Sequence, residues 1–96
     1  MTFMIVEIEC VLDEAGYGRY IDAVLPIVVR HGGRYLARTE DSITSSRGPQ
    51  PARVILLAFD NRAQLESCFA STEYRAIAGL REVATISRSL VFEGIE

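Results

Sequence analysis

The chain contains no lysine and no tryptophan, and it has few cysteines and histidines. All ten of its basic residues are arginine, which excludes Schiff-base chemistry on a lysine and any lysine-dependent phosphate loop. Two cysteines, Cys10 and Cys68, and the single histidine, His31, fall short of the roughly four nitrogen or sulfur ligands of a structural zinc site. We therefore expect no metal, no cofactor and two reduced, buried thiols.

Long hydrophobic runs and blocks of basic residues are also missing. The longest apolar run, VILLAF at residues 54–59, is too short to span a bilayer. No basic region precedes a hydrophobic segment at the N-terminus, so a signal peptide is not indicated. The net charge is −3, with acidic and basic residues interspersed, which leaves no basic stripe for nucleic acid. A cytoplasmic location, with neither a membrane nor a nucleic acid as partner, is the expectation.

The size and composition favour a small folded protein. Residues 1–96 are expected to form a single domain at the small end of the usual range. Nearly half of the residues, 49%, are hydrophobic, which argues against disorder. A chain this short leaves much apolar surface uncovered unless it pairs with another chain.

Residue spacing predicts four strands and three helical segments. The expected strands are residues 3–12, Arg34–Thr39, Arg53–Phe59 and residues 86–93. Apolar residues at steps of three and four predict a helix from Tyr17 to the glycines at 32 and 33. Pro26 lies inside that pattern and predicts a kink near residues 22–26. The segment DEAG before this helix is interpreted as a turn, and residues 40–51 as a flexible loop whose role stays open.

The second helical region is expected in two pieces. Asp60 or Asn61 caps its first piece, and Gln64 is placed to complete a capping box on Asn61. A break near Ser71 and Thr72 begins the second piece.

The resulting order, βαββαβ, is that of the ferredoxin-like α+β sandwich, with helices on one face of an antiparallel four-stranded sheet. A sheet covered on one face should alternate apolar and polar residues, but VILLAF at residues 54–59 does not alternate. We therefore expect the second sheet face to be buried as well, in a homodimer that packs sheet face to sheet face.

The segment HGGRYLAR, residues 31–38, combines a helix end with a strand. The two glycines are interpreted as a helix cap and a tight entry into the strand. In a regular strand Arg34, Leu36 and Arg38 share one face, and Tyr35 shares the other with Ala37 and Thr39. Two arginines on one face could hold a carboxylate, with Arg38 the better candidate. The alternative is ion pairing with Glu40, Asp41 or a partner chain.

Three tyrosines and a second arginine are further candidates for a ligand pocket. Tyr17, Tyr20 and Tyr74 are expected between the helices and the sheet, where they suit either a core edge or the wall of a pocket for an aromatic ligand. Arg81 follows Tyr74 on the same helix face, and with Arg38 it could form a cationic mouth to that pocket.

Candidates for acid–base catalysis are weak. His31 has a suitable unperturbed pKa, but a cation at the last turn of a helix is also stabilised by the helix dipole. Glu7 and Glu9 are expected on the same sheet layer as Phe3, Ile5 and Val11. A buried carboxylate there would need a partner or a raised pKa, as a general base does, although a salt bridge across the dimer is the simpler interpretation.

Five segments together resemble the family called domain of unknown function 1330. They are Tyr17, Tyr20 and Pro26, then residues 31–38, residues 51–59, residues 71–81 and residues 90–95. The loop before the third strand often carries a tryptophan in this family, and here it has none. The resemblance implies a dimeric α+β barrel, but no reaction. The wider superfamily includes cofactor-free monooxygenases, haem-degrading enzymes, lactone isomerases and stress-response barrel proteins, and a shared fold does not fix function.

Two classes of function follow. The first is a cofactor-independent enzyme or binder that acts on a small anionic or aromatic molecule between helices and sheet, with Arg38 orienting the negative charge. The second is a non-catalytic dimeric accessory or stress-related module. Haem is disfavoured, because a single histidine at a helix end is thin support for an axial ligand.

Overall fold

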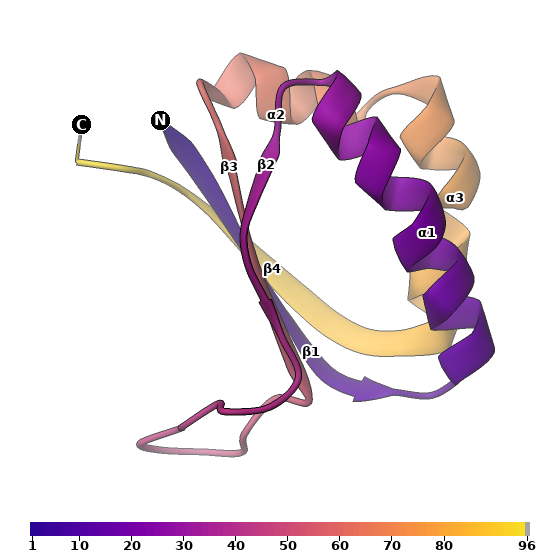
Figure 1. Ribbon diagram of the computed structural model, residues 1–96, viewed down its shortest axis with the longest axis vertical. Coiled ribbons are helices and arrows are strands. Elements are labelled where there is room, and N and C mark those ends of the chain that lie inside the picture. The colour runs from indigo at the N-terminus through magenta and orange to yellow at the C-terminus, as the bar shows by residue number, and fades with distance from the viewer. Residues whose placement is uncertain (96) are drawn as a thin grey trace.

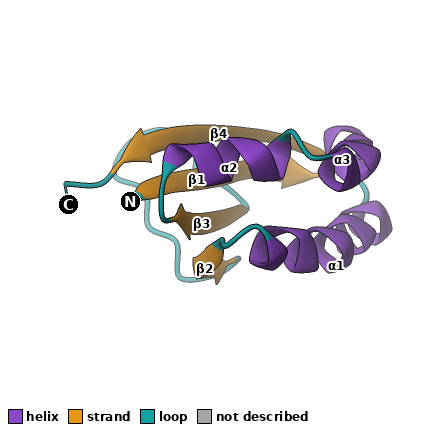
Figure 2. Cartoon of the chain, turned by 90° about the horizontal axis from the view of Figure 1, so that it is seen from above, coloured by secondary structure: helices purple, strands orange, loops and turns teal. Residues whose placement is uncertain are grey.

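The computed structural model describes residues 1–95, so Glu96 of the expected domain lies outside the described residues. Seven elements follow one another: β1 (Thr2–Val11), α1 (Glu14–Arg30), β2 (Arg34–Thr39), β3 (Arg53–Phe59), α2 (Arg62–Phe69), α3 (Thr72–Ala84) and β4 (Thr85–Glu93). The strands form one antiparallel sheet in the order β2-β3-β1-β4. All three helices lie on the same side of this sheet (Figures 1 and 2). The predicted ferredoxin-like α+β fold is confirmed.

The N-terminus of α1 corrects one sequence prediction. The segment DEAG, interpreted as a turn, is the cap and first turn of α1, because the Asp13 carboxylate accepts a hydrogen bond of 3.1 Å from the backbone N–H of Gly16. An aspartate at this position supplies an acceptor that the first helical N–H groups otherwise lack. The helix then continues without interruption past Pro26 to Arg30.

The caps of α2 and α3 lie where the sequence placed them. The Asn61 side chain accepts from the backbone N–H of Gln64 at 2.9 Å. The Gln64 side chain in turn accepts from the N–H of Asp60 at 3.2 Å, one residue before the expected partner. Ser71 caps α3 by accepting from the N–H of Tyr74 at 3.1 Å. The N-termini of both helices are therefore fixed by side-chain hydrogen bonds.

The hydrophobic core lies between the helices and the sheet. Phe59, Ile8, Val28 and Cys68 are its largest fully buried apolar side chains. Gly33 lets the end of α1 approach this core closely, because a Cβ there would lie 2.6 Å from Val28 Cγ1 and 2.7 Å from Phe59 Cζ. The neighbouring Gly32 has φ +84°, a conformation that glycine adopts without strain. The glycines of HGGRYLAR thus form the corner between helix and strand.

The other face of the sheet carries an apolar patch, which we call the outer sheet face. The strand registers place apolar side chains of β1, β3 and β4 side by side on it: Phe3, Ile5, Val54, Leu56, Leu90 and Phe92. The rings of Phe3 and Phe92 lie 5.8 Å apart. Leu90 and Phe92 remain exposed by 45% and 44%. No helix among residues 1–95 has the length and apolar character needed to cross a membrane.

Candidate functional site

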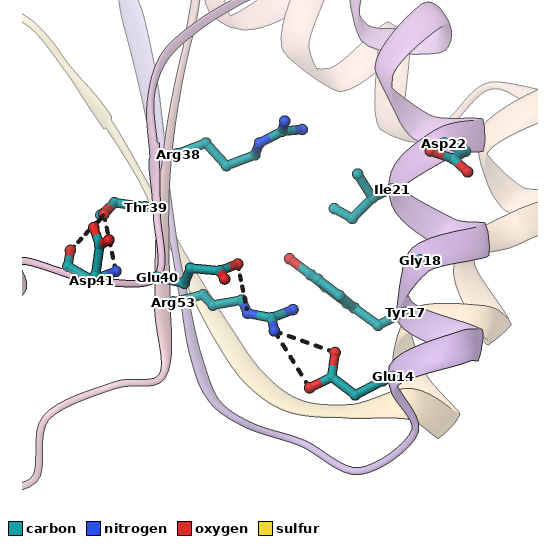
Figure 3. Close-up of a pocket in the computed structure, with 10 residues that line it drawn as sticks. All are labelled: Glu14, Tyr17, Gly18, Ile21, Asp22, Arg38, Thr39, Glu40, Asp41 and Arg53. Atoms are coloured by element: carbon teal, nitrogen blue, oxygen red, sulfur yellow. Dashed lines mark hydrogen bonds and ion pairs between the residues drawn. The ribbon is translucent and has the colours of Figure 1, made fainter.

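A β-bulge in β2 decides which side chains of HGGRYLAR face the helices. Tyr35 pairs with Leu57 and Ala37 pairs with Leu56, so Leu36 is an extra residue in β2. Beyond the bulge Arg38 pairs with Ile55, whose side chain is buried under the helices. Arg38 therefore points to the helix side of the sheet, as Figure 3 shows. A bulge that turns a side chain in this way is common beside binding sites.

The bulge makes the predicted grouping of the arginines wrong. Arg34 pairs with Ala58, on the face opposite to Tyr35 and Arg38. Its guanidinium lies 3.5 Å from the Asp60 carboxylate and contacts the sulfur of Met1 at 3.7 Å. Arg34 and Arg38 therefore do not grip one ligand together, and Arg38 shares a face with Tyr35 instead.

Arg38 lines a cavity of about 650 Å³ between the N-terminal half of α1 and the ends of β2 and β3, which we call the outer cavity (Figure 3). Its charged lining comprises two arginines and four carboxylates: Arg38, Arg53, Glu14, Asp22, Glu40 and Asp41. Within residues 1–95 the Arg38 side chain forms no ion pair or hydrogen bond, whereas Arg53 is fully engaged.

Arg53 contacts several other residues that line the outer cavity. Its guanidinium lies 3.3 Å from Glu14 and 3.6 Å from Glu40, and its central carbon lies 4.8 Å from the centre of the Tyr17 ring. Burial raises the pKa of the Tyr17 hydroxyl, although Arg53 acts in the opposite direction. Because Glu40 pairs with Arg53, it does not serve as the predicted ion-pair partner of Arg38. Asp41, the other, interacts with the Thr39 hydroxyl.

A second cavity, the inner cavity, lies beside the first between the helices and the sheet. Its volume is about 70 Å³, and Tyr17 and Ile21 line both cavities. Most of its wall is apolar, but it includes Tyr20, Tyr74 and Arg81. The structure thus brings the predicted tyrosines together with Tyr35 around one space. Arg81 lies at the inner cavity and Arg38 at the outer one, so the two arginines do not form a common mouth.

Two tyrosine hydroxyls form a polar spot in the apolar wall. The hydroxyl oxygens of Tyr20 and Tyr74 lie 2.9 Å apart, and their rings meet edge to face with centroids 6.3 Å apart. Burial, followed by the bond to Tyr74, raises the pKa of the Tyr20 hydroxyl far above its ordinary value. The Tyr20 hydroxyl therefore stays protonated at neutral pH and acts as a hydrogen-bonding group rather than as a base.

His31 lies outside both cavities. It caps the C-terminus of α1, and its Nδ1 lies 3.0 Å from the carbonyl oxygen of Ile27 and 3.9 Å from the Glu73 carboxylate. Glu73 also pairs with Arg30. The surroundings of His31 are those of a helix cap on the surface.

The strand glutamates lie on the outer sheet face. Glu7 lies 3.9 Å from Arg88 of the neighbouring strand, and both residues, with Glu9, line a cavity of about 330 Å³ on that side. Glu9 is the extra residue of a second bulge, after which Val11 turns to the helix side and packs on the core. Glu7 and Glu9 therefore do not share a layer with Val11, and neither reaches a ligand in the inner cavity.

Alkaline pH is expected to destabilise the protein. Burial raises the pKa of Tyr35 from 10.0 to about 12, against the effect of Arg38, and burial raises the pKa of Cys68 from 9.0 to about 11. The unfolded chain releases these protons at lower pH than the folded chain, so stability is complete below pH 9 and is lost as pH rises towards 12. Urea unfolding at about pH 8 and about pH 11 measures the loss, and Tyr35→Phe should reduce it. Equal free energies of unfolding at both pH values would contradict the assignment.

Several residues of the outer cavity are not visible as site residues in the sequence. The sequence places Arg53 at the start of a strand, Glu14 in the turn predicted for DEAG, and Asp22 in the first helix. Only the strand register and the direction of α1 bring them together with Arg38. Within residues 1–95 no three His, Cys, Asp or Glu side chains are arranged to hold a metal ion.

Comparison with known proteins places this geometry in a wider group. The family model for a domain of unknown function, DUF1330, matches residues 1–95. No curated protein matches the sequence. A solved protein of unknown function from Rhodopseudomonas palustris superposes with a TM-score of 0.81 at 16% identity, over 99% of this chain and 83% of that one.

Two other solved structures are similar in fold. A dimeric ferredoxin-like protein of unknown function from Jannaschia sp. has a TM-score of 0.69 at 14% identity, with 97% and 98% of the two chains covered. A cofactor-independent oxygenase from Streptomyces nogalater has a TM-score of 0.65 at 12% identity, with 99% and 92% covered. At such identities the likeness concerns the fold alone.

Proposed function

The chain belongs to the DUF1330 family, and from the two cavities we propose that it binds a small monoanion with an apolar body. The anionic group pairs with Arg38 in the outer cavity. The body passes Tyr17 and Ile21 and enters the inner cavity, since these two residues line both spaces. The observation that carries the proposal is the Arg38 guanidinium, which the bulge turns into the cavity without a partner among residues 1–95.

A carboxylate is the group that Arg38 suits best. A guanidinium offers a planar fork of N–H donors that matches two carboxylate oxygens. The other arginine of the cavity, Arg53, already contacts Glu14 and Glu40, so it has little capacity left for a ligand. One free arginine therefore sets the position of one negative charge.

The excess of carboxylates in the outer cavity limits the charge of the ligand. Four acidic residues and two arginines line it, so a second negative charge on the ligand within the outer cavity would be repelled. Arg38 is exposed, and such a site contributes modestly to affinity and weakens with salt. A monoanion bound at low ionic strength is the expected case, and a dianion of the same length should bind less well.

The removal of Arg38 is expected to weaken binding by up to about fivefold, because an exposed ion pair contributes up to about 1 kcal/mol. Titration of ¹⁵N-labelled protein with pentanoate, followed by amide chemical shifts, measures this for Arg38→Ala. Arg34→Ala is the matched control, because Arg34 lies on the same strand but faces away from the cavity. Glutarate, a dianion of equal length, tests the charge limit.

Two results would contradict the proposal. An unchanged pentanoate affinity in Arg38→Ala would show that Arg38 does not bind the anionic group. An equal loss in Arg34→Ala would mean that only the general positive charge matters.

A cofactor-independent reaction on the bound molecule is one use of such a site, and a protein from Streptomyces nogalater that is similar in fold is a cofactor-independent oxygenase. Of the carboxylates that line the outer cavity, Glu14 and Glu40 pair with Arg53 and Asp41 contacts Thr39, so Asp22 would be the candidate proton acceptor. The second candidate, a non-catalytic dimeric module, is favoured by the outer sheet face. Substrate turnover by the wild type, lost in Arg38→Ala, would separate the two.

We also propose that the outer sheet face packs against the same face of a second copy. Its apolar side chains have no cover from the helices, and the similar Jannaschia protein is described as dimeric. Burial of large apolar side chains is the main favourable term in association. Both cavities lie on the helix side, so this pairing leaves them accessible. Two free thiols suit the reducing cytoplasm, which we propose as the location.

A further inference from the structure

Arg81 brings an unpaired donor to the inner cavity. One of its terminal nitrogens donates to the Ser87 hydroxyl at 3.2 Å. Its Nε is fully shielded from solvent and has no hydrogen-bond partner in the part of the chain that the structure describes, residues 1–95. A buried N–H without a partner is costly. Arg81 also lines the inner cavity, and a small rotation of its side chain would present this N–H to an oxygen placed there.

The tyrosine pair provides a second donor in the same cavity. In the contact between the hydroxyls of Tyr20 and Tyr74 at 2.9 Å, one hydroxyl donates and the other accepts. The accepting hydroxyl keeps its own hydrogen, which stays free for another group. Both tyrosines line the inner cavity together with Arg81. This end of the cavity therefore combines two donors in a wall that is otherwise mostly apolar.

The size of the inner cavity limits what can enter. Its volume of about 70 Å³ corresponds to roughly two water molecules in liquid volume. A ligand can place only a terminal group of about four heavy atoms there, while the rest lies in the outer cavity. An acetyl-sized group meets this limit.

We propose that the ligand is an oxo acid, with a carboxylate at one end and a carbonyl group at the other. This inference rests on the proposed function, which places the carboxylate on Arg38, and it adds that the carbonyl oxygen accepts hydrogen bonds from Arg81 Nε and the Tyr20–Tyr74 pair. The ligand therefore has two polar ends and an apolar middle that passes Tyr17 and Ile21.

Matched pairs of acids test the carbonyl end. 4-Oxopentanoate, 5-oxohexanoate and 6-oxoheptanoate differ from 4-methylpentanoate, 5-methylhexanoate and 6-methylheptanoate only by C=O in place of CH–CH₃. At the length that spans the two cavities, the oxo acid is expected to bind at least about tenfold more tightly, as for hydrogen bonds to a charged donor. Amide chemical shifts again report the dissociation constants.

Variants assign the preference to its donors. Arg81→Met and Tyr74→Phe should each reduce the ratio of the two dissociation constants towards one. Tyr17→Phe is the control, because Tyr17 lines the passage rather than contributing to the hydroxyl pair, and it should keep the ratio. Since each ratio compares two ligands on one variant, a general loosening of the cavity affects both and cancels. Tyr74→Phe keeps the test valid if Arg81→Met fails to fold.

The outcomes separate this inference from the proposed function. Equal affinities within every pair, with both ligands weakened in Arg38→Ala, would overturn the oxo-acid assignment and leave the anion site intact. A preference for the oxo acid that persists in both Arg81→Met and Tyr74→Phe would also overturn it. No binding of any acid at millimolar concentration would overturn the proposed function together with the inference.

Discussion

Replacing Phe59 with alanine is expected to lower the free energy of unfolding by about 3–5 kcal/mol. Phe59 is fully buried at the end of β3, its ring packs edge to face on Phe69 with centroids 6.2 Å apart, and Gly33 approaches it from the corner after α1. Loss of the ring removes apolar contact and leaves a cavity in a well-packed interior. The total free energy of unfolding of a protein is about 5–15 kcal/mol, so this substitution removes a large fraction of the stability.

Urea unfolding measured by circular dichroism checks this expectation. Phe59→Leu, which retains most of the apolar contact, should lose less and keeps the test informative if the alanine variant is unfolded. Val83→Ala is the surface control, because Val83 on α3 is 75% exposed, and it should stay within about 0.5 kcal/mol of the wild type. A loss below about 1 kcal/mol in Phe59→Ala would mean that this corner is not packed as described.

A charge at the centre of the outer sheet face is expected to separate the proposed dimer. Ile5 lies on β1 between Leu56 of β3 and Leu90 of β4. In a twofold dimer, Ile5→Arg introduces two guanidiniums into one interface, and an unpaired buried charge costs about 3–5 kcal/mol. The dissociation constant should rise by a hundredfold or more, since about 1.4 kcal/mol corresponds to a factor of ten.

Size-exclusion chromatography with light scattering at micromolar concentration distinguishes the two states. The wild type and Val83→Arg, which adds the same charge on exposed α3, should elute with the mass of two chains, and Ile5→Arg with the mass of one. A dimeric Ile5→Arg variant would move the interface to another surface. A monomeric wild type would remove the proposed dimer altogether.

The fold could be predicted from the sequence because the residues that end its helices and strands can be recognised locally. Glycines end the first helix, a polar loop separates β2 from β3, and both strands have the bounds that the sequence predicted. The DEAG segment was missed since a capping aspartate and a turn aspartate look alike without the following N–H groups. The helix on its C-terminal side settles which of the two it is.

The site was less predictable, because two bulges change which way the side chains point. Regular alternation in β2 puts Arg38 with Arg34, but the extra residue Leu36 moves Arg38 to the side of Tyr35. Nothing in the local sequence distinguishes Leu36 from a regular strand residue, since the bulge depends on pairing with a distant strand. The ion pairs of Arg53 with Glu14 and Glu40, which leave Arg38 unpaired, likewise depend on tertiary structure.

The buried thiol of Cys68 gives the protein an internal reporter of its own opening. Cys68 is completely covered on α2, whereas Cys10 is partly accessible on β1. In a Cys10→Ser background, a disulfide reagent can label the chain only when the helix layer opens, so the labelling rate follows the population of open molecules. Phe69 and Tyr74, close to Cys68 in the chain, line the inner cavity. A ligand that binds there stabilises the closed form and slows labelling by the same factor. Binding can therefore be measured without an added fluorophore.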